Sequence, residues 1–575
     1  MTSPASPILT VDALTIAFGG QGRPAVNGID FDLHAGRVLA LVGESGSGKS
    51  ASAMSLLGLL PDTARVDGTA RLGETELIGA DPQRLRAVRG GRIGTIFQEP
   101  MSAFTPAYRI GWQIAEAIRA HHVKMPRAEV QRRVMELLES VGITDTTRIA
   151  RSFPHQLSGG QLQRAMIAMA ISCDPVALIA DEPTTALDVT VQAGILDLLR
   201  SLRDERGCAI LLITHDMGVV ADLADDVVVL RGGEVVERAP VADLFSVPQQ
   251  EYTRELLDAV PWLVHRQALR QAQDRPQAQD RPQQPGAPRA ALDEPEAETA
   301  AAVGNVSIAY GASTGSATRA GSATRVVVQD ATFTIPRGST VGLVGESGSG
   351  KSTLGRALAG LVPVTKGTAT VAGVDVTRAR GRALRELRRR IGYVFQDPAS
   401  SINPRLTIGD AIAEPLRVHT AKSAAARRER SLTLLDAVQL PSSVIDRHPH
   451  ELSGGQRQRI GIARAIALDP ELLIADEPTS ALDVSVQAKV LRLLAELQRD
   501  LGFACLFISH DLAVVRELAS RVVVLQQGRV VEQGPADRVL SAPSDPYTRH
   551  LLAAVPVADP DEQRRRRQLG QEAAA

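Results

Sequence analysis

One eight-residue segment occurs twice in this sequence, and this duplication constrains the fold more than any other feature. GESGSGKS fills residues 43–50 and again, letter for letter, residues 345–352. LSGGQ, IADEPT and a His-Asp pair are also repeated, each 295 positions further on, as from Asp181 to Asp476. A chain of 575 residues with this repeat is predicted to fold as two related domains, each with a core of its own.

Composition predicts where the two domains end. Residues between them are rich in Pro, Gln and Ala and lack the apolar side chains of a core, so we interpret them as a flexible linker. The biased tract at 315–325 is interpreted as a flexible hairpin insertion, and the end with Arg564 to Arg567 as a solvated tail. The predicted division is a first domain at 1–263, a linker at 264–300, a second domain at 301–558 and a tail at 559–575.

Charge, hydropathy and cysteine spacing exclude several classes of protein. Lys and Arg number 64 against 65 Asp and Glu, so no global basic field would gather nucleic acid. No stretch approaches the roughly 18 apolar residues of a membrane-spanning helix, and the first residues do not resemble a signal peptide. Cys173, Cys208 and Cys505 lie far apart, so we expect neither a disulfide framework nor a zinc site. The chain is expected to stay in the cytosol.

The hydrophobic pattern predicts an α/β core with a mostly parallel sheet. A short apolar run at 38–42 leads into the first glycine-rich segment, and a helical pattern at 51–60 follows it. Two further apolar runs, at 177–180 and 209–214, are typical of buried parallel strands, and a helical stretch at 189–202 separates them.

The repeated GxxxxGK[ST] segment predicts a phosphate-binding loop. Its glycines let consecutive backbone N–H groups point at a phosphate, and the following helix presents its positive end. Lys49 and Lys351 can then reach the β and γ phosphates, while the hydroxyls of Ser50 and Ser352 can coordinate Mg²⁺. One copy is an imperfect signal, but two identical copies make a purely structural role improbable. The candidate nucleotide-binding residues here are Gly43, Glu44, Ser45, Gly46, Ser47, Gly48, Lys49, Ser50 and Ala51, and Gly345, Glu346, Ser347, Gly348, Ser349, Gly350, Lys351, Ser352 and Thr353.

IADEPT delivers two adjacent carboxylates at the end of a strand, and their side chains must diverge. We assign Asp181 and Asp476 to Mg²⁺, and Glu182 and Glu477 to the base that faces the attacking water. The alternative for a lone pair of this kind is an acidic cap on a turn. The phosphate loop upstream favours the catalytic interpretation.

LSGGQ is predicted to start a helix. Its serine is a good N-cap, and its two glycines allow another backbone to approach closely. Alone, SGG is ordinary turn chemistry, but it lies 23 residues before the acidic pair in both halves, as from Ser158 to Asp181. The candidate nucleotide contacts in the two copies are Ser158, Gly160 and Gln161, and Ser453, Gly455 and Gln456.

Together these residues resemble the ATP-binding-cassette (ABC) ATPases over nearly all of both halves. The resemblance implies two tandem ABC-type P-loop NTPase domains, each a mostly parallel sheet core with a helical subdomain and an antiparallel β subdomain. It also implies that the two cassettes pair head to tail within the chain. Each ATP would then lie between the phosphate loop of one cassette and the LSGGQ of the other.

The same resemblance assigns roles to residues outside the loop. Gln98 and Gln396, in IFQEP and VFQDP, match the glutamine that senses Mg²⁺ and water, and His215 and His510 match the histidine that contacts the γ-phosphate.

Two further assignments from the resemblance are less specific. Phe18 and Tyr310 match the aromatic that stacks on adenine, although a lone aromatic there more often belongs to the core. Ala51 departs from the pattern that Thr353 keeps, which is expected to weaken phosphate contacts at the first site.

The end of each half resembles one branch of the family. EYTRELLDAVP at 251–261 and PYTRHLLAAVP at 546–556 are similar to the oligopeptide/dipeptide importers, a branch that includes glutathione, microcin and nickel importers. As a structural alternative, this motif is an amphipathic helix that packs on the cassette. Some members hold an iron–sulfur cluster near this region, but none of the three cysteines lies there, so we predict no cluster.

Membership of that branch implies partners and a location. Two integral-membrane permease subunits would dock through the segments at 99–156 and 397–451, and an extracytoplasmic solute-binding protein would act indirectly. The chain would lie on the cytoplasmic face of the membrane as a peripheral subunit, with no nucleic-acid partner. The competing hypothesis is a soluble tandem-cassette ATPase that acts on ribosomes or nucleic acid.

Overall fold

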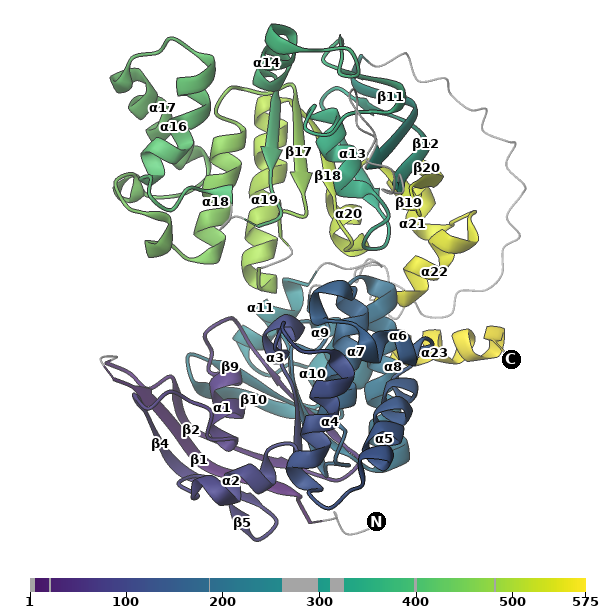
Figure 1. The fold of residues 1–575 in the computed structure, drawn as a ribbon. Coiled ribbons are helices and arrows are strands. Elements are labelled where there is room, and N and C mark those ends of the chain that lie inside the picture. The colour runs from purple at the N-terminus through teal and green to yellow at the C-terminus, as the bar shows by residue number, and fades with distance from the viewer. Residues whose placement is uncertain are drawn as a thin grey trace, which may run out of the picture. The chain divides into compact units, whose positions relative to one another are not determined.

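The structure is a computed structural model that describes residues 6–574 apart from 20–21, 186, 261–297, 311–324, 398–400 and 480–481. The chain forms two compact units, the first comprising Met1–Val260, Asp483–Ser485 and Ala553–Ala575 and the second Pro261–Leu482 and Val486–Leu552. Almost all of the predicted linker and of the predicted hairpin insertion lies outside the described residues. The two units repeat one architecture (Figure 1).

A six-stranded sheet forms the centre of the first unit, in the order β10-β9-β3-β8-β7-β6. Every pairing is parallel except that of the edge strand β10 with β9. The strands are β3 (Val38–Val42), β6 (Ile93–Ile96), β7 (Ala177–Asp181), β8 (Ala209–Ile213), β9 (Asp226–Arg231) and β10 (Glu234–Pro240). All five residues of β3, β7 and β8 are buried, as expected of strands covered on both faces. The predicted parallel α/β core is confirmed.

A second, antiparallel sheet completes the β structure of this unit in the order β2-β1-β4-β5. Its strands are β1 (Leu9–Phe18), β2 (Val26–Leu33), β4 (Ala64–Leu72) and β5 (Thr75–Glu76). In β2 the last five residues alternate between buried and exposed, so one face of this sheet packs on the core. Apolar residues of both sheets and of α1 (Lys49–Leu56) form one core cluster.

Helices cover the parallel sheet and form a group beside it. α4, α5, α6 and α7 pack on one another, and α7 also contacts β6. The helices of the first unit are α1, α2 (Pro82–Val88), α3 (Pro100–Ala103), α4 (Ile110–His121), α5 (Arg127–Ser140), α6 (Thr146–Arg151), α7 (Gly159–Ala170), α8 (Val189–Arg206), α9 (Met217–Leu223), α10 (Val241–Ser246), α11 (Glu251–Asp258) and α23 (Pro560–Ala574), with a 3₁₀ turn, η1, at Pro154–Gln156.

The second unit repeats both sheets, in the orders β12-β11-β14-β15 and β16-β17-β18-β13-β19-β20. Its strands are β11 (Thr299–Tyr310), β12 (Arg325–Pro336), β13 (Thr340–Val344), β14 (Lys366–Val371), β15 (Val374–Asp375), β16 (Ile391–Val394), β17 (Leu472–Asp476), β18 (Ala504–Ile508), β19 (Arg521–Gln526) and β20 (Arg529–Pro535). Its helices are α13 (Lys351–Leu358), α14 (Gly381–Arg389), α16 (Ile408–His419), α17 (Ala424–Ala437), α18 (Gly454–Ala465), α19 (Val484–Leu501), α20 (Leu512–Leu518), α21 (Ala536–Ser541) and α22 (Pro546–Ala554), with 3₁₀ turns at Ser442–Val444 and Pro449–Glu451.

The topology gathers the repeated motifs at one edge of each parallel sheet. In the first unit Leu41 and Asp181 both pair with Ile213, so the carboxyl ends of β3, β7 and β8 lie side by side. The phosphate loop, the acidic pair and the histidine follow these three strand ends. Ligands of open α/β sheets bind at this edge.

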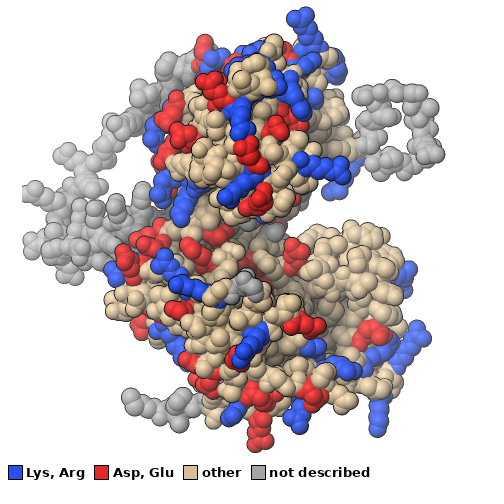
Figure 2. Space-filling view, turned by 90° about the vertical axis from the view of Figure 1, so that its left-hand side faces the viewer, with Lys and Arg blue, Asp and Glu red and all other residues tan. Residues whose placement is uncertain are grey.

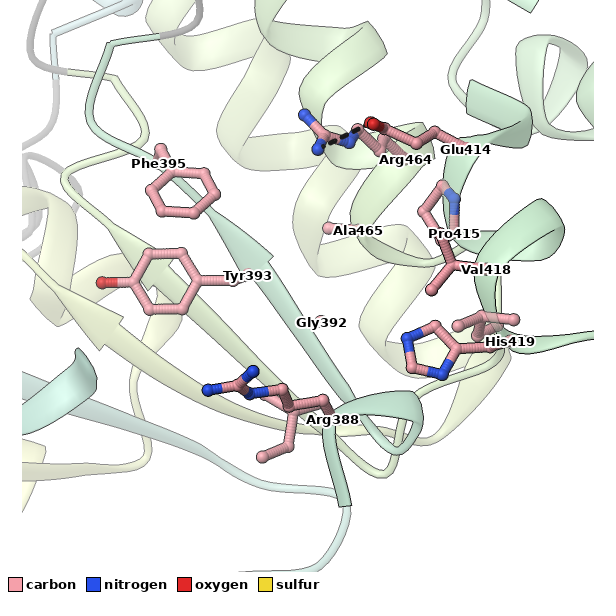
Figure 3. Close-up of a pocket in the computed structure, with 12 residues that line it drawn as sticks. Arg388, Gly392, Tyr393, Phe395, Glu414, Pro415, Val418, His419, Arg464 and Ala465 are labelled. Atoms are coloured by element: carbon pink, nitrogen blue, oxygen red, sulfur yellow. Dashed lines mark ion pairs between the residues drawn. The ribbon is translucent and has the colours of Figure 1, made fainter. Parts of the chain in front are cut away.

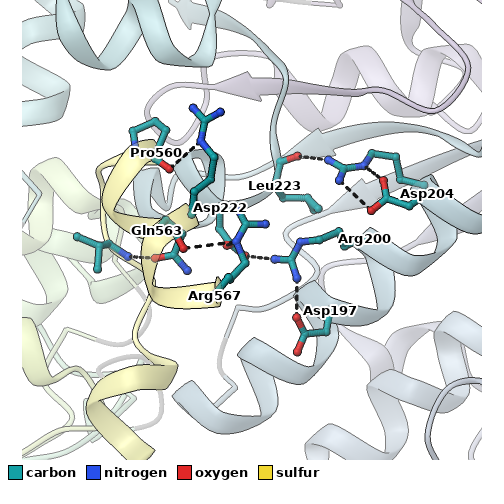
Figure 4. A network of polar contacts seen from close by, with 11 residues as sticks. Asp197, Arg200, Asp204, Asp222, Leu223, Pro560, Gln563 and Arg567 are labelled. Atoms are coloured by element: carbon teal, nitrogen blue, oxygen red, sulfur yellow. Dashed lines mark hydrogen bonds and ion pairs between the residues drawn. The ribbon is translucent and has the colours of Figure 1, made fainter. Parts of the chain in front are cut away.

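The carboxyl-terminal segment differs from the solvated tail that we expected. Helix α23 belongs to the first unit and packs against α9 and α10. The side chain of Asp222, at the end of α9, is 3% exposed, and it pairs with Arg200 at 2.7 Å and with Arg567 of α23 at 3.5 Å (Figure 4). The arginines at this end of the chain therefore include one that serves a buried carboxylate.

The surface of the units reflects the even charge balance of the sequence. Figure 2 shows basic and acidic side chains interspersed over the face in view. Among the residues that the structure describes, none of the helices is both long and apolar enough to cross a bilayer.

Candidate functional site

The glycine-rich loop joins β3 to α1 and has the backbone geometry that the sequence predicts. Gly43, Gly46 and Gly48 have φ of 148°, 80° and 98°, a region that disfavours side chains. A Cβ on Gly43 would also collide with the carbonyl oxygen of Leu230 at the end of β9. Gly345, Gly348 and Gly350 repeat this geometry in the second unit, with φ of 146°, 78° and 105°.

The loop lysine lies inside the loop. Lys49 Nζ donates hydrogen bonds to the carbonyl oxygens of Gly43 and Glu44, both at 2.8 Å. Burial lowers the pKa of Lys49 below its ordinary value. Lys351 Nζ makes the equivalent bonds to Gly345 and Glu346 at 2.7 and 2.8 Å. An ammonium group is thus held at the base of each loop, where an anion would meet it.

A hydroxyl and a carboxylate meet beside each loop. Ser50 Oγ donates to Asp181 Oδ1 at 3.0 Å, and Ser352 Oγ donates to Asp476 Oδ1 at 2.7 Å. Burial raises the pKa of Asp181 to about 6 in the first unit. Each pair brings two oxygen donors to one point next to the loop.

The adjacent glutamate points elsewhere, as the sequence predicts. Glu182 has a left-handed φ of 47°, a conformation that costs about 1–3 kcal/mol in a residue other than glycine, and its N–H donates to Ile213 O at 2.8 Å. Its carboxylate contacts three side chains: Gln98 Nε2 at 2.8 Å, Thr185 Oγ1 at 3.0 Å and His215 Nδ1 at 3.0 Å. The two carboxylates therefore serve different partners.

Charge interactions keep this glutamate ionised. Burial by itself would raise the pKa of Glu182, but the hydrogen bond and charge of His215 outweigh it and leave that pKa below its ordinary value. Burial would lower the pKa of His215, yet Glu182 raises it above its ordinary value. A carboxylate that stays ionised can accept a proton from water, and the three donors hold it in one position.

The second unit reproduces this cluster. Glu477 also has a φ of 47°, and its carboxylate lies 2.9 Å from Gln396 Nε2 and 3.3 Å from His510 Nδ1. The pKa of Glu477 is lowered and that of His510 raised, with the same opposition between burial and the partner's charge. The structure thus brings together, in each unit, the lysine, serine, aspartate, glutamate, glutamine and histidine that the sequence singled out.

LSGGQ begins a helix in both units, which confirms that expectation. Ser158 caps α7, its Oγ accepting from Gln161 N at 3.3 Å, while Gln161 Oε1 accepts from Ser158 N at 3.3 Å. Ser453 and Gln456 form the same capping box at the start of α18. A Cβ on Gly160 would lie 2.7 Å from Val191, so this glycine serves a close approach to α8 of its own unit. Gly455 stands in the same relation to Val486.

The remaining predicted residues take different positions. Phe18 ends β1 and packs, partly buried, against the core, whereas Tyr310 ends β11 and is 44% exposed. Ala51 also packs on the core of the first unit. The adenine-stacking role of both aromatics stays a prediction.

Comparison with known proteins places this geometry in a family. The family described as "ABC transporter" matches residues 26–185 and 328–480, more than half of the chain. The chain belongs to the ABC transporter family. Its cassettes are ATP-binding domains, and the transporter ATP-binding proteins of this family are ATPases.

Relatives of this ABC protein share its full two-cassette length. The oligopeptide transport ATP-binding protein of Mycobacterium tuberculosis is 44% identical over 96% of this chain and 99% of its own. The glutathione import ATP-binding protein of Escherichia coli is 45% identical, covering 98% of this chain and 92% of its own. The family described as "Oligopeptide/dipeptide transporter, C-terminal region" matches residues 236–288 and 531–575. An ATP-binding cassette solved with ADP and phosphate is 30% identical over 41% of this chain and 98% of its own, with a TM-score of 0.37. The predicted membership of the oligopeptide/dipeptide importer branch is confirmed.

Sequence reasoning missed one pair of contacts in these ABC cassettes. Tyr252 of α11 and Tyr547 of α22 reach the phosphate loops of their own units. The only signal was the repetition of Tyr-Thr-Arg at 252–254 and 547–549, which was interpreted as a family signature and a packing helix.

Proposed function

We propose that the chain is the ATP-hydrolysing subunit that energises a membrane importer of peptides or related solutes. The observation that carries this proposal is the completeness of both sites in a chain whose two C-terminal segments match the oligopeptide/dipeptide transporter region. The relatives named as oligopeptide and glutathione import proteins support the solute class. ATP binding would close the two cassettes and hydrolysis would reopen them, because only ATP supplies γ-phosphate contacts.

Mg²⁺ is the metal that fits the donors beside each loop. Ser50 with Asp181, and Ser352 with Asp476, offer the hydroxyl and carboxylate oxygens that this hard cation prefers. A bound Mg²⁺ would neutralise phosphate charge during phosphoryl transfer. Gln98 and Gln396 are proposed as additional contacts to the metal and its water.

Hydrolysis follows from the positions of the glutamates. Glu182 accepts a proton from water as the water oxygen bonds to the γ-phosphorus and the bond from that phosphorus to the bridging oxygen breaks, leaving ADP and phosphate. His215 keeps the carboxylate charged and oriented, and Lys49 binds the phosphates. Gln98 and Thr185 occupy the same carboxylate oxygen, Oε2, so one of them moves aside when water binds there.

We further propose that each ATP is shared between cassettes, so that Ser158, Gly160 and Gln161 complete the second loop's site and Ser453, Gly455 and Gln456 the first. Each serine is exposed at the start of a 12-residue helix, where the first backbone N–H groups favour an anion.

Permease docking is proposed for the helical segments that follow the two glutamines, at 99–156 and 397–451. In the second unit a cavity of about 340 Å³ lies between β16 and helices α16 and α18, next to the glutamine segment (Figure 3). Phe395, Pro415 and Val418 line it, and Arg464 pairs with Glu414 across its rim at 3.0 Å. In the first unit the exposed rings of Tyr108 and Trp112 stack with centroids 4.3 Å apart. Apolar surface of this kind is typical of protein contacts.

Uptake in cells tests the proposal. The Glu182→Gln, Glu477→Gln double variant should bind to membranes as the wild-type protein does. A strain that carries it should fail to accumulate whichever labelled solute the wild type imports, among di- and oligopeptides, glutathione and nickel. The matched control is Glu255→Gln, which removes an exposed carboxylate of α11. Trp112→Ala should instead lower the fraction of the chain that sediments with membranes while basal ATPase activity is kept. Normal entry of every solute in the double variant would refute the importer role.

A further inference from the structure

Each unit places a tyrosine hydroxyl on the backbone of its own phosphate loop. Tyr252 Oη accepts a hydrogen bond from the N–H of Glu44 at 3.3 Å, and Tyr547 Oη accepts one from the N–H of Glu346 at 3.1 Å. The tyrosines are 5% and 9% exposed. The two residues in contact are 208 positions apart in the sequence of the first unit and 201 apart in the second.

A glutamate fixes the helix that carries each tyrosine, and it is buried in the first unit and partly buried in the second. Glu237 of β10 accepts hydrogen bonds from the N–H groups of the two residues before α11, at 2.8 and 3.1 Å. Glu532 of β20 does the same before α22, at 2.8 and 3.2 Å. An external carboxylate thus satisfies backbone donors at each helix start. Tyr252 and Tyr547 lie within three residues of the backbone groups that the glutamates bind. Each glutamate therefore also fixes the position of the tyrosine ring relative to the loop.

The anchored peptide is also the one that the loop lysine holds. Lys49 Nζ donates to the carbonyl oxygens of Gly43 and Glu44, so the Glu44 residue is bound at its N–H by Tyr252 and at its C=O by Lys49. When the lysine turns to the phosphates of ATP, the tyrosine keeps its hold on the loop.

We infer that Tyr252 and Tyr547 are positioning residues for ATP, which hold the phosphate loops in their binding conformation after the lysines leave the backbone. A role in packing alone would need only the ring, because phenylalanine fills the same space. The hydroxyl is the atom that touches the loop in both units, although the ring surroundings differ. Arg231 lies over the ring of Tyr252 at 4.5 Å, and Gln526 takes the place of that arginine in the second unit.

Phenylalanine variants separate these roles. Tyr252→Phe, Tyr547→Phe and the double variant should each raise the KM for ATP, by about fivefold for each loop, with kcat within about twofold of wild type, since one neutral hydrogen bond to the loop is lost. Ser246→Ala is the control, because it removes an exposed hydroxyl that bonds to the Asp243 carbonyl of its own helix, α10.

Hydrogen exchange gives a readout that does not depend on turnover. In the nucleotide-free protein, Tyr252→Phe should speed amide exchange in the loop at 43–50 and leave that at 345–352 unchanged, and Tyr547→Phe should do the reverse. Each loop is thereby the control for the other, while unchanged melting temperatures exclude general unfolding. An unaltered KM together with unaltered loop exchange would overturn the inference, as would a loss of kcat at constant KM.

Discussion

Replacement of Arg567 by glutamine should release the carboxyl-terminal helix from the first unit. The side chain of Asp222 is 3% exposed and has two cationic partners, Arg200 Nη2 at 2.7 Å and Arg567 Nε at 3.5 Å (Figure 4). At 3.5 Å and an effective dielectric constant near 20, the attraction between the charges of Arg567 and Asp222 is about 5 kcal/mol. Burial opposes this gain, since it lowers the pKa of Arg567.

The net effect is smaller than the attraction. Removing one partner of a buried pair typically costs about 3–5 kcal/mol, whereas an exposed pair contributes about 0–1 kcal/mol. Arg567 is 28% exposed, and Arg200 still serves the carboxylate after the change, so we expect about 2 kcal/mol. This loss bears on the docking of α23 rather than on the whole fold, because the helix packs against α9 and α10 and contributes no strand to either sheet of the unit.

Amide exchange measured along α23 reports that docking energy. A loss of about 2 kcal/mol corresponds to roughly 30-fold faster exchange in Pro560–Ala574. Arg565→Gln is the matched control, since this arginine is 68% exposed and pairs with Glu562 at 3.7 Å, and its exchange should change less than about twofold. Equal exchange in Arg567→Gln and the control would refute the reasoning, and so would full additivity with Asp222→Asn in a double-mutant cycle.

Two further predictions concern single groups in the sites. In nitrogen-15 NMR of the nucleotide-free protein, His215 and His510 should titrate above the ordinary histidine pKa of 6.5, while His419, whose pKa is lowered by burial and by neighbouring arginines, should titrate below it. Because their folded-state pKa values are raised, His215 and His510 stabilise the fold fully below pH 6.5 and lose that contribution as pH rises through the folded-state pKa. A lowered pKa for His215 would contradict the conclusion that the charge of Glu182 outweighs burial. Tyr393→Phe removes a hydrogen bond to Asp476 Oδ2 at 2.9 Å. In a Glu182→Gln background it should raise the Mg²⁺ concentration for half-maximal ATPase activity about fivefold. An unchanged concentration would show that the phenol does not position this carboxylate.

The sequence was sufficient for features that depend on local pattern. The run at 38–42 is buried on both faces, and the loop after it needs glycine for its backbone angles, so strand, loop and helix could all be predicted. The partition of the acidic pair could also be predicted, because consecutive side chains at a strand end diverge. Asp181 faces Ser50 and Glu182 faces His215, so the two carboxylates diverge as predicted.

Features that depend on distant partners could not be predicted. The arginines at 564–567 have the composition of a solvated end, and the carboxylate that Arg567 serves lies 345 positions earlier, at Asp222. The contact of Tyr252 could not be predicted for another reason: its partner is a backbone N–H, which has no signature in the sequence. The left-handed φ of Glu182 was likewise not apparent, because glutamate has no preference for that conformation.

Identical motifs do not make the two ATP sites equal, because the neighbours of each motif set its charge and geometry. Asp476 receives a hydrogen bond from Tyr393 of β16, whereas the corresponding strand β6 has Thr95 at that register. Burial raises the pKa of Asp181 to about 6, so this carboxylate takes up a proton as pH falls through that value, and a cation at the first site must then displace the proton. Metal binding at the first site should therefore weaken as pH falls below about 6.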